Sequence, residues 1–152
     1  MIVCPFNIRG VGGAPKLHAL RRFFDKIKPD IVLIQEMMCC GIIACESFLR
    51  ILSRWEVFVI DSSRLSGGFL AACDPTVANL NSFNIFAGIL LEGRVRGLYE
   101  TVKVVNCYAP FSGKRQYWED VMDSGILLED NLIFCGDINL TIYQFEIWGG
   151  HC

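Results

Sequence analysis

The chain lacks the long apolar run and the N-terminal leader that mark membrane and secreted proteins. Its 152 residues contain no uninterrupted apolar stretch of the roughly 18 residues that a membrane-spanning helix needs. The first residues also lack a basic segment followed by a small-residue cleavage site. We therefore expect an intracellular protein in a reducing compartment, with no membrane partner and with the nucleus as a candidate location.

Histidine and excess positive charge are also scarce. The formal net charge is -2, so any affinity for nucleic acid must come from a local patch. The two histidines, His18 and His151, lie apart in sequence from the cysteine cluster Cys39, Cys40 and Cys45. Because no second cysteine pair or nearby histidine completes a set of four ligands, we do not expect structural zinc.

Four of the eight cysteines lie inside or beside apolar, strand-like runs: Cys4, Cys73, Cys107 and Cys135. Cysteine in such a position behaves as a small buried hydrophobe. Together with the expected reducing compartment, this pattern predicts no disulfide partner.

The composition favours one globular domain over residues 1–152. Hydrophobic residues make up 53% of the chain and charged residues 20%, which is enough apolar material for a sizeable core and unlike a disordered segment. The opening residues predict a strand that reaches Asn7, followed by a helix whose apolar face runs from Leu17 to Ile27 and stops before Pro29. With a strand over residues 31–34, this pattern is typical of a βαβ unit and predicts an α/β fold.

The rest of the chain predicts further strands and two shorter helices. The segment from Met37 to Arg54 is ambiguous, with a candidate helix over residues 46–52. Phe83–Leu91 and Tyr99–Asn106 read as two antiparallel strands joined by a turn at Glu92-Gly93-Arg94. Strands are also expected over residues 55–60, 69–73 and 132–135, a turn at Asp74-Pro75, and a helix over residues 115–122.

Polar residues occupy the ends of several predicted strands. They are Asn7, Glu36, Tyr108, Asp137 and Asn139. In open α/β sheets the ligand crevice lies beyond the carboxyl ends of the strands, so Glu36 and Asp137 could converge on one hard cation that prefers oxygen ligands. Taken singly, each residue has a plain structural alternative: a solvated strand-end carboxylate, a core aromatic with an exposed hydroxyl, or a turn-forming asparagine.

Four short motifs occur in order along the chain: Asn7-Ile8-Arg9-Gly10, Ile34-Gln35-Glu36, Asn106-Cys107-Tyr108-Ala109-Pro110 and Gly136-Asp137-Ile138-Asn139. Together they resemble the endonuclease/exonuclease/phosphatase superfamily, and most closely the endonuclease domains of plant non-LTR (LINE-type) retrotransposons. Two further segments, Ser66-Gly67-Gly68-Phe69 and Glu146-Ile147-Trp148-Gly149-Gly150, are also similar to plant members. The resemblance implies the DNase I-like four-layer α/β sandwich with two facing sheets.

The resemblance also implies a role for each strand-end residue. Glu36 would bind Mg²⁺, or Mn²⁺ in its place, with Asn7 beside the ion. Tyr108 would donate to the phosphate, Asp137 would orient or deprotonate the attacking water, and Asn139 would hold the phosphate in register. The implied reaction is metal-assisted phosphodiester hydrolysis with DNA as the substrate.

The chain departs from the family pattern at its C-terminal end and at Pro5. The Ser-Asp-His motif that closes family members is absent, and His151 is not expected to replace its histidine because catalytic placement must be good to about an ångström. We therefore expect a domain without its C-terminal part, an incomplete second sheet with uncovered edges that favour self-association or aggregation, and impaired activity. The alternative function is an inactive retroelement remnant or a weak nucleic-acid-binding module. Pro5 is compatible with the opening strand only at a sheet edge or bulge.

Overall fold

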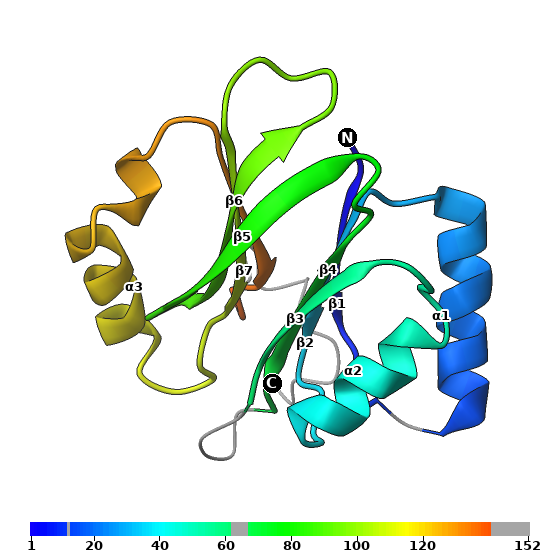
Figure 1. The fold of residues 1–152 in the computed structure, drawn as a ribbon. Helices are drawn as coiled ribbons and strands as arrows, with labels where there is room; N and C mark the ends of the chain where they lie inside the picture. The colour runs from blue at the N-terminus through cyan, green and yellow to red at the C-terminus, as the bar shows by residue number, and fades with distance from the viewer. Residues whose placement is uncertain (12, 62–66, 141–152) are drawn as a thin grey trace.

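Two four-stranded sheets lie face to face, with helices on both outer sides (Figure 1). The computed structural model describes residues 1–11, 13–61 and 67–140. Helix α3 (Lys114–Asp123) covers the outer side of one sheet, and helices α1 (Ala14–Ile27) and α2 (Gly41–Leu49) cover the outer side of the other. The predicted α/β class and its four layers are therefore present. None of the helices in the described ranges has the length and apolarity required to traverse a lipid bilayer.

The first sheet is built around the predicted βαβ unit. Strand β1 (Val3–Asn7) runs parallel to β2 (Ile31–Gln35), and α1 connects them across the outer face. Antiparallel strands β4 (Phe69–Cys73) and β3 (Glu56–Ile60) complete the order β1-β2-β4-β3. Pro5 lies in β1, an edge strand with no neighbouring strand on its open side. A missing backbone N–H is tolerated at such an edge.

The second sheet has the order β5-β6-β7-β8, from β5 (Ala78–Ile85), β6 (Gly88–Val95), β7 (Val102–Tyr108) and β8 (Leu132–Asp137). The first three strands are antiparallel neighbours, whereas β7 and β8 are parallel and joined through α3 and the short 3-10 helix η1 (Ile126–Leu128). The second sheet therefore also ends in a parallel pair with a helical crossover. Both parallel pairs bring the carboxyl ends of their strands to one edge of their sheet.

The predicted strand Phe83–Leu91 and the turn at Glu92-Gly93-Arg94 are wrong. The chain reverses at Phe86-Ala87, where Ile85 pairs with Gly88 across a two-residue hairpin, and residues 92–94 lie inside β6. Gly93 is a site of close backbone approach, because a Cβ there would lie 2.1 Å from the carbonyl oxygen of Asn79. The antiparallel pairing of this region with the next strand is confirmed, but the connection lies between Val95 and Val102.

Helix α2 begins five residues before the predicted start at Glu46. Its buried side is made by Gly41, Ala44 and Phe48, while Ile42 and Ile43 face solvent. Apolar residues therefore lie on both sides of the helix, which removed the amphipathic pattern that marks a helix in sequence. The remaining predicted elements match the structure to within a few residues.

The strand β2 is buried on both faces. Ile31 and Leu33 pack between the two sheets, against Ala71, Ile89 and Leu91 among others. Val32 and Ile34 face the other way, into the layer formed by α1 and α2. This two-sided burial explains the uninterrupted apolar run in the sequence.

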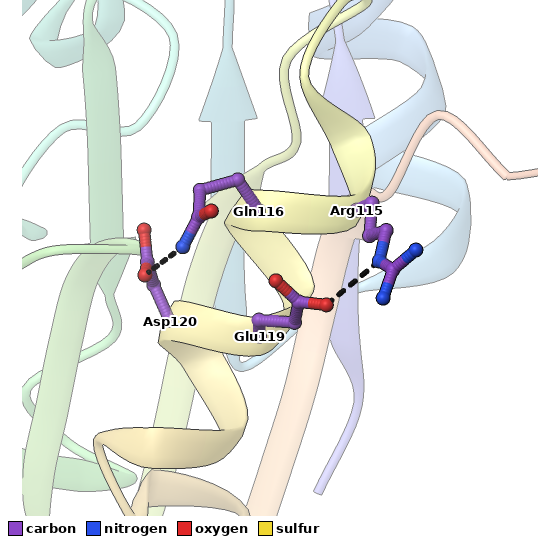
Figure 2. Close-up of polar contacts among 4 residues, drawn as sticks. All are labelled: Arg115, Gln116, Glu119 and Asp120. Carbon is purple, nitrogen blue, oxygen red and sulfur yellow. Dashed lines mark hydrogen bonds and ion pairs between the residues drawn. The ribbon is translucent and has the colours of Figure 1, made fainter.

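Helix α3 has a buried side and a solvent side. Tyr117 and Val121 pack against the second sheet. On the solvent side, Arg115 pairs with Glu119 at 2.8 Å and Gln116 donates to Asp120 at 2.9 Å, each four residues apart (Figure 2). Such pairs add a few tenths of a kcal/mol to a short helix, roughly 0.2–0.5 each.

The seven cysteines of the described residues are free thiols. Cys73 and Cys107 are fully buried as predicted. Cys4 and Cys135 are only partly buried, because each lies on a strand at the edge of its sheet.

Candidate active site

The ends of four strands, two from each sheet, bring the predicted site residues to one place. Asn7 ends β1 and Glu36 follows β2 directly, while Tyr108 and Asp137 end β7 and β8. Tyr108 and Asp137 are register partners in the parallel pair β7/β8. Asn139 lies two residues beyond Asp137. The five residues are all partly exposed, as substrate access requires.

The side chain of Asn7 joins the two sheets. Its amide nitrogen donates to Oε1 of Glu36 at 2.9 Å and to Oδ2 of Asp137 at 2.7 Å. These two carboxylate oxygens, one from each sheet, are therefore at most 5.6 Å apart, the sum of the two distances. The amide oxygen of Asn7 accepts the backbone N–H of Arg9 at 3.2 Å, so the nitrogen is the atom that faces the carboxylates.

Asp137 and Asn139 form a compact turn against the end of β7. The backbone N–H of Asn139 donates to Oδ1 of Asp137 at 3.0 Å, and the Asn139 amide donates to the carbonyl of Ala109 at 2.6 Å. Lys114, at the start of α3, donates to the backbone carbonyl of Asn139. Both carboxylate oxygens of Asp137 thus accept a hydrogen bond. Asn139 is held by three hydrogen bonds, through its backbone N–H, its side-chain amide and its backbone carbonyl. The sequence did not point to Lys114.

The hydroxyl of Tyr108 is held in its protonated form. A side-chain hydrogen bond with Glu36 raises the pKa of Tyr108, and burial and the negative charge of Glu36 act in the same direction. A contact with Asn139 opposes the shift. Tyr108 is therefore a neutral hydrogen-bond donor at neutral pH.

The backbone beside Glu36 is unusual. Glu36 has φ 55°, and Arg9, Met38 and Asn139 also have φ between 44° and 52°. Residues with a Cβ rarely adopt this region, and each such position costs about 1 kcal/mol or more. The exits of β1 and β2 hold each other here, since the N–H of Gly10 donates to the carbonyl of Glu36 at 2.6 Å. Strain of this kind gathers at functional sites.

Gly67 gives a physical reason for one of the sequence motifs. A Cβ at this position would lie 2.9 Å from the Cα of Glu36, so only glycine lets the chain pass so close. The carbonyl of Gly67 also accepts the N–H of Met38 at 2.8 Å. Gly67 therefore supports the loop that carries Glu36. The neighbouring Ser66 lies outside the described residues, as do the motif at residues 146–150 and His151.

A buried pair of amide side chains lies directly beneath the site. Gln35 is 1% exposed and Asn106 is 0% exposed, and Gln35 donates to the amide oxygen of Asn106. The amide nitrogen of Asn106 donates to the carbonyls of Ile34 and Leu70, both at 3.1 Å. This Gln35–Asn106 pair links β2 and β4 of the first sheet to β7 of the second. In the sequence, each of these amides lies next to an apolar run and just before a site residue. That pattern alone did not indicate a role for either amide.

The donor set fits a hard divalent cation. Two carboxylates, Glu36 and Asp137, lie around one amide, and Mg²⁺ is held by one or two carboxylates with water filling its other positions. Within the ranges that the structure describes, no three His, Cys, Asp or Glu side chains gather in a way that suits a metal ion.

The histidine of the described residues and two arginines of the second sheet lie away from this site. His18 is exposed on α1. Arg94 and Arg96 are exposed at the end of β6 opposite to the strand ends that carry Tyr108 and Asp137. Among the described residues, the candidate site therefore contains carboxylates, amides, a phenol and a lysine, but no histidine.

No protein-family model matches the chain, and no curated protein matches its sequence. Solved structures do match. An AP endonuclease from Archaeoglobus fulgidus aligns over 98% of this chain and 62% of its own, with a TM-score of 0.66 and 18% identity. D. rerio TDP2 complexed with a single-strand DNA product aligns over 91% and 60%, with a TM-score of 0.66 and 15% identity.

An endonuclease/exonuclease/phosphatase family protein from Bacteroides thetaiotaomicron aligns over 90% of this chain and 62% of its own, with a TM-score of 0.67 and 14% identity. The chain thus spans about three fifths of the length of these structures. At these identities the likeness concerns the fold, and it confirms the predicted DNase I-like α/β sandwich.

Proposed function

We propose that this chain is a divalent-metal-dependent phosphodiesterase that hydrolyses DNA, of the retrotransposon endonuclease type. The observation that carries the proposal is the contact of Asn7 with Glu36 and Asp137. It joins two carboxylates from different sheets at the carboxyl ends of their strands, where a phosphate and an ion can both reach them. The likeness to an AP endonuclease and to a DNA-bound TDP2 supports DNA as the substrate.

Glu36 would be the principal ligand of Mg²⁺, with Mn²⁺ as a substitute, and Asp137 lies on the other side of Asn7. When bound, the ion supplies positive charge that stabilises the phosphoryl oxygens as negative charge develops on them. Asn7 presents its nitrogen to both carboxylates, so its part is to orient them.

The remaining residues position the water and the phosphate. Asp137 is the acceptor for the proton of the attacking water, and its two hydrogen bonds, from Asn7 and from the N–H of Asn139, fix the direction of its lone pairs. The neutral Tyr108 hydroxyl donates to a phosphoryl oxygen. Asn139 keeps the end of β8 against the end of β7, which maintains the distance between these two groups.

We expect hydrolysis by this chain to be slow. The residues described at the site include no histidine, and a positioned general acid or base of that kind contributes about 10²- to 10⁴-fold. The same observation favours the second candidate function, a catalytically inactive remnant of a retroelement that binds nucleic acid weakly. The resemblance of the motifs to plant retrotransposon endonuclease domains favours the retrotransposon type over other phosphoesterases.

Relaxation of supercoiled plasmid DNA tests the proposal. The chain should nick the plasmid in Mg²⁺ or Mn²⁺ and not in EDTA, and Asp137→Ala should reduce the rate by about 10²-fold or more because the proton acceptor is lost. Asp130→Ala is the matched control: Asp130 is exposed and precedes the opposite end of β8, so the rate should not change.

Two results would count against the hydrolase. Nicking that survives Asp137→Ala would reveal a contaminating nuclease. Absence of metal-dependent nicking, in a preparation that is folded by circular dichroism, would leave the inactive remnant as the better account.

A further inference from the structure

A cavity of about 560 Å³ opens directly beside Asp137. It is lined by Phe111 and Lys114, which follow β7, and by the segment from Gly136 to Leu140, which contains the end of β8. We call it the Phe111 pocket. Its volume lies within the range of about 300–1,000 Å³ that is usual for ligand sites. Because Asp137 and Asn139 form part of its wall, an occupant would sit next to the reacting phosphate.

The lining of the Phe111 pocket is apolar and exposed. Phe111 is 84% exposed, Leu140 50% and Ile138 38%. Among the described residues, these three side chains stay exposed next to a polar catalytic edge, and gathered apolar exposure of this kind marks a binding surface. An accessible aromatic ring is the usual platform on which proteins stack unpaired bases.

One positive charge faces the same space. The Lys114 ammonium lies 5.5 Å from the centre of the Phe111 ring and donates to the carbonyl of Asn139. The first turn of α3 contains no acidic residue, and the carboxylate in the pocket wall, Asp137, already accepts hydrogen bonds from Asn7 and Asn139. The next residue, Arg115, is turned outward to Glu119 (Figure 2), so Lys114 is the cation of the α3 first turn that lies on the pocket. A planar ring beside one cation is complementary to a nucleobase attached to a phosphate.

We propose that the Phe111 pocket binds one unstacked nucleobase of the DNA strand, adjacent to the scissile phosphate. Phe111 is the stacking platform, Ile138 and Leu140 cover the edge of the base, and Lys114 contacts the neighbouring phosphate. The inference rests on the proposed function, and it narrows the substrate to DNA with an unpaired nucleotide at the cleavage site. A fully stacked duplex cannot place a base in this pocket without flipping it out.

Binding of a short fluorescein-labelled single-stranded oligodeoxynucleotide, measured by anisotropy in EDTA, tests the pocket without hydrolysis. Phe111→Ala should weaken binding by about 5- to 160-fold, the range that corresponds to loss of one aromatic base-stacking partner. Phe111→Trp should bind as tightly as the unaltered chain or more tightly. Tyr99→Ala is the matched control, because Tyr99 is 97% exposed and lies between β6 and β7, at the end remote from Tyr108.

A second ligand separates stacking from charge. An oligomer with the same number of phosphates but abasic sugars should bind the unaltered chain and Phe111→Ala equally, because Phe111 contacts only the base. The inference is overturned if Phe111→Ala binds the base-containing oligonucleotide as the unaltered chain does, or if the two ligands show the same loss. It is also overturned if the unaltered chain does not bind the oligonucleotide.

The pocket and the proposed hydrolase fail in different ways. If plasmid is nicked in Mg²⁺ but Phe111→Ala leaves oligonucleotide binding unchanged, the hydrolase stands and the pocket does not. If Phe111→Ala abolishes binding but no variant hydrolyses DNA, the pocket stands as the binding site of a non-catalytic module.

Discussion

The two sheets share one arrangement and differ in burial. Each ends in a parallel pair with a helical crossover, β1-α1-β2 in one and β7-α3-β8 in the other. In the first sheet all five residues of β2 are buried, whereas in the second sheet β5 exposes five of its eight residues. The shared arrangement delivers the site residues to one edge. The difference in burial is that between a central strand and an edge strand, and it affects how much each strand contributes to stability and how easily each was recognised in sequence.

Replacing one leucine in β2 tests the difference in burial, and we expect the largest effect here. Leu33 is 0% exposed between the sheets, so Leu33→Ala should lower the free energy of unfolding by about 2–5 kcal/mol. Phe83→Ala, in β5, should cost less than about 1 kcal/mol because Phe83 is 47% exposed. Urea unfolding followed by circular dichroism measures both. Equal losses of unfolding free energy in the two variants would show that the difference in burial between β2 and β5 does not affect stability.

Breaking the Gln35–Asn106 pair tests how the sheets are held together. Asn106→Ala leaves the Gln35 amide and the carbonyls of Ile34 and Leu70 without their partner, which should cost about 1–3 kcal/mol of unfolding free energy. The rate of DNA nicking should fall as well, because Glu36 directly follows Gln35 and Tyr108 lies two residues after Asn106. Asn79→Ala, at an exposed position in β5, is the control and should change neither quantity.

Adding Gln35→Ala to Asn106→Ala checks the origin of that loss. If the two residues act as a pair, the double variant should lose clearly less than the sum of the single variants. Additive losses would mean that the contact between the two amides does not stabilise the chain.

The sheets should also differ in their part in metal binding. Glu36→Gln should weaken Mn²⁺ binding by about tenfold or more, equivalent to about 1.4 kcal/mol, because the first sheet supplies the principal ligand. Asp137→Asn should weaken it less and should mainly slow hydrolysis. Water proton relaxation by bound Mn²⁺ measures the affinity, with Glu119→Gln on the solvent side of α3 as the control. Unchanged affinity in Glu36→Gln would remove Glu36 from the metal site.

Buried thiols in both sheets predict a loss of stability at alkaline pH. Burial raises the pKa of Cys73 and of Cys107 from 9.0 to about 12. A raised pKa in the folded state gives stability that is complete below about pH 9 and is lost as the pH rises toward about 12, because only the unfolded chain ionises in between. For each of the two thiols, the free energy of unfolding should fall by about 1.4 kcal/mol between about pH 8 and pH 10, or about 3 kcal/mol together.

Variants at single cysteines assign this pH dependence. Cys107→Ala should reduce it by about half, since one of the two thiols that stay protonated in the folded chain is gone. Cys40→Ala should not, because Cys40 is exposed. A slope that is the same in Cys107→Ala and in the unaltered chain would show that other groups cause the alkaline loss.

Elements with a strong local pattern were predicted well. The apolar face of α1 repeats at helical spacing, and β2 and β8 begin as uninterrupted apolar runs. The β5/β6 hairpin was missed because its reversal at Phe86-Ala87 has none of the usual turn residues, and because Gly93 imitates a turn while serving a close contact between strands. Local signals therefore failed where a distant part of the chain determined the conformation.

The sequence by itself determined which polar residues end which strands. Asn7, Glu36, Tyr108, Asp137 and Asn139 each follow or close a recognisable apolar run, and their positions along the chain needed no knowledge of the fold. Strand character depends on neighbours in sequence, so it can be read locally.

Only the tertiary structure decided that these strand ends meet and what holds them together. Asn7 contacts Asp137 across 130 positions of the chain, and Gln35 contacts Asn106 across 71. Such contacts depend on how two sheets pack and on which face each side chain takes, and no local pattern encodes either. Lys114 and the Phe111 pocket have the same origin: they exist because α3 begins where β7 and β8 end side by side.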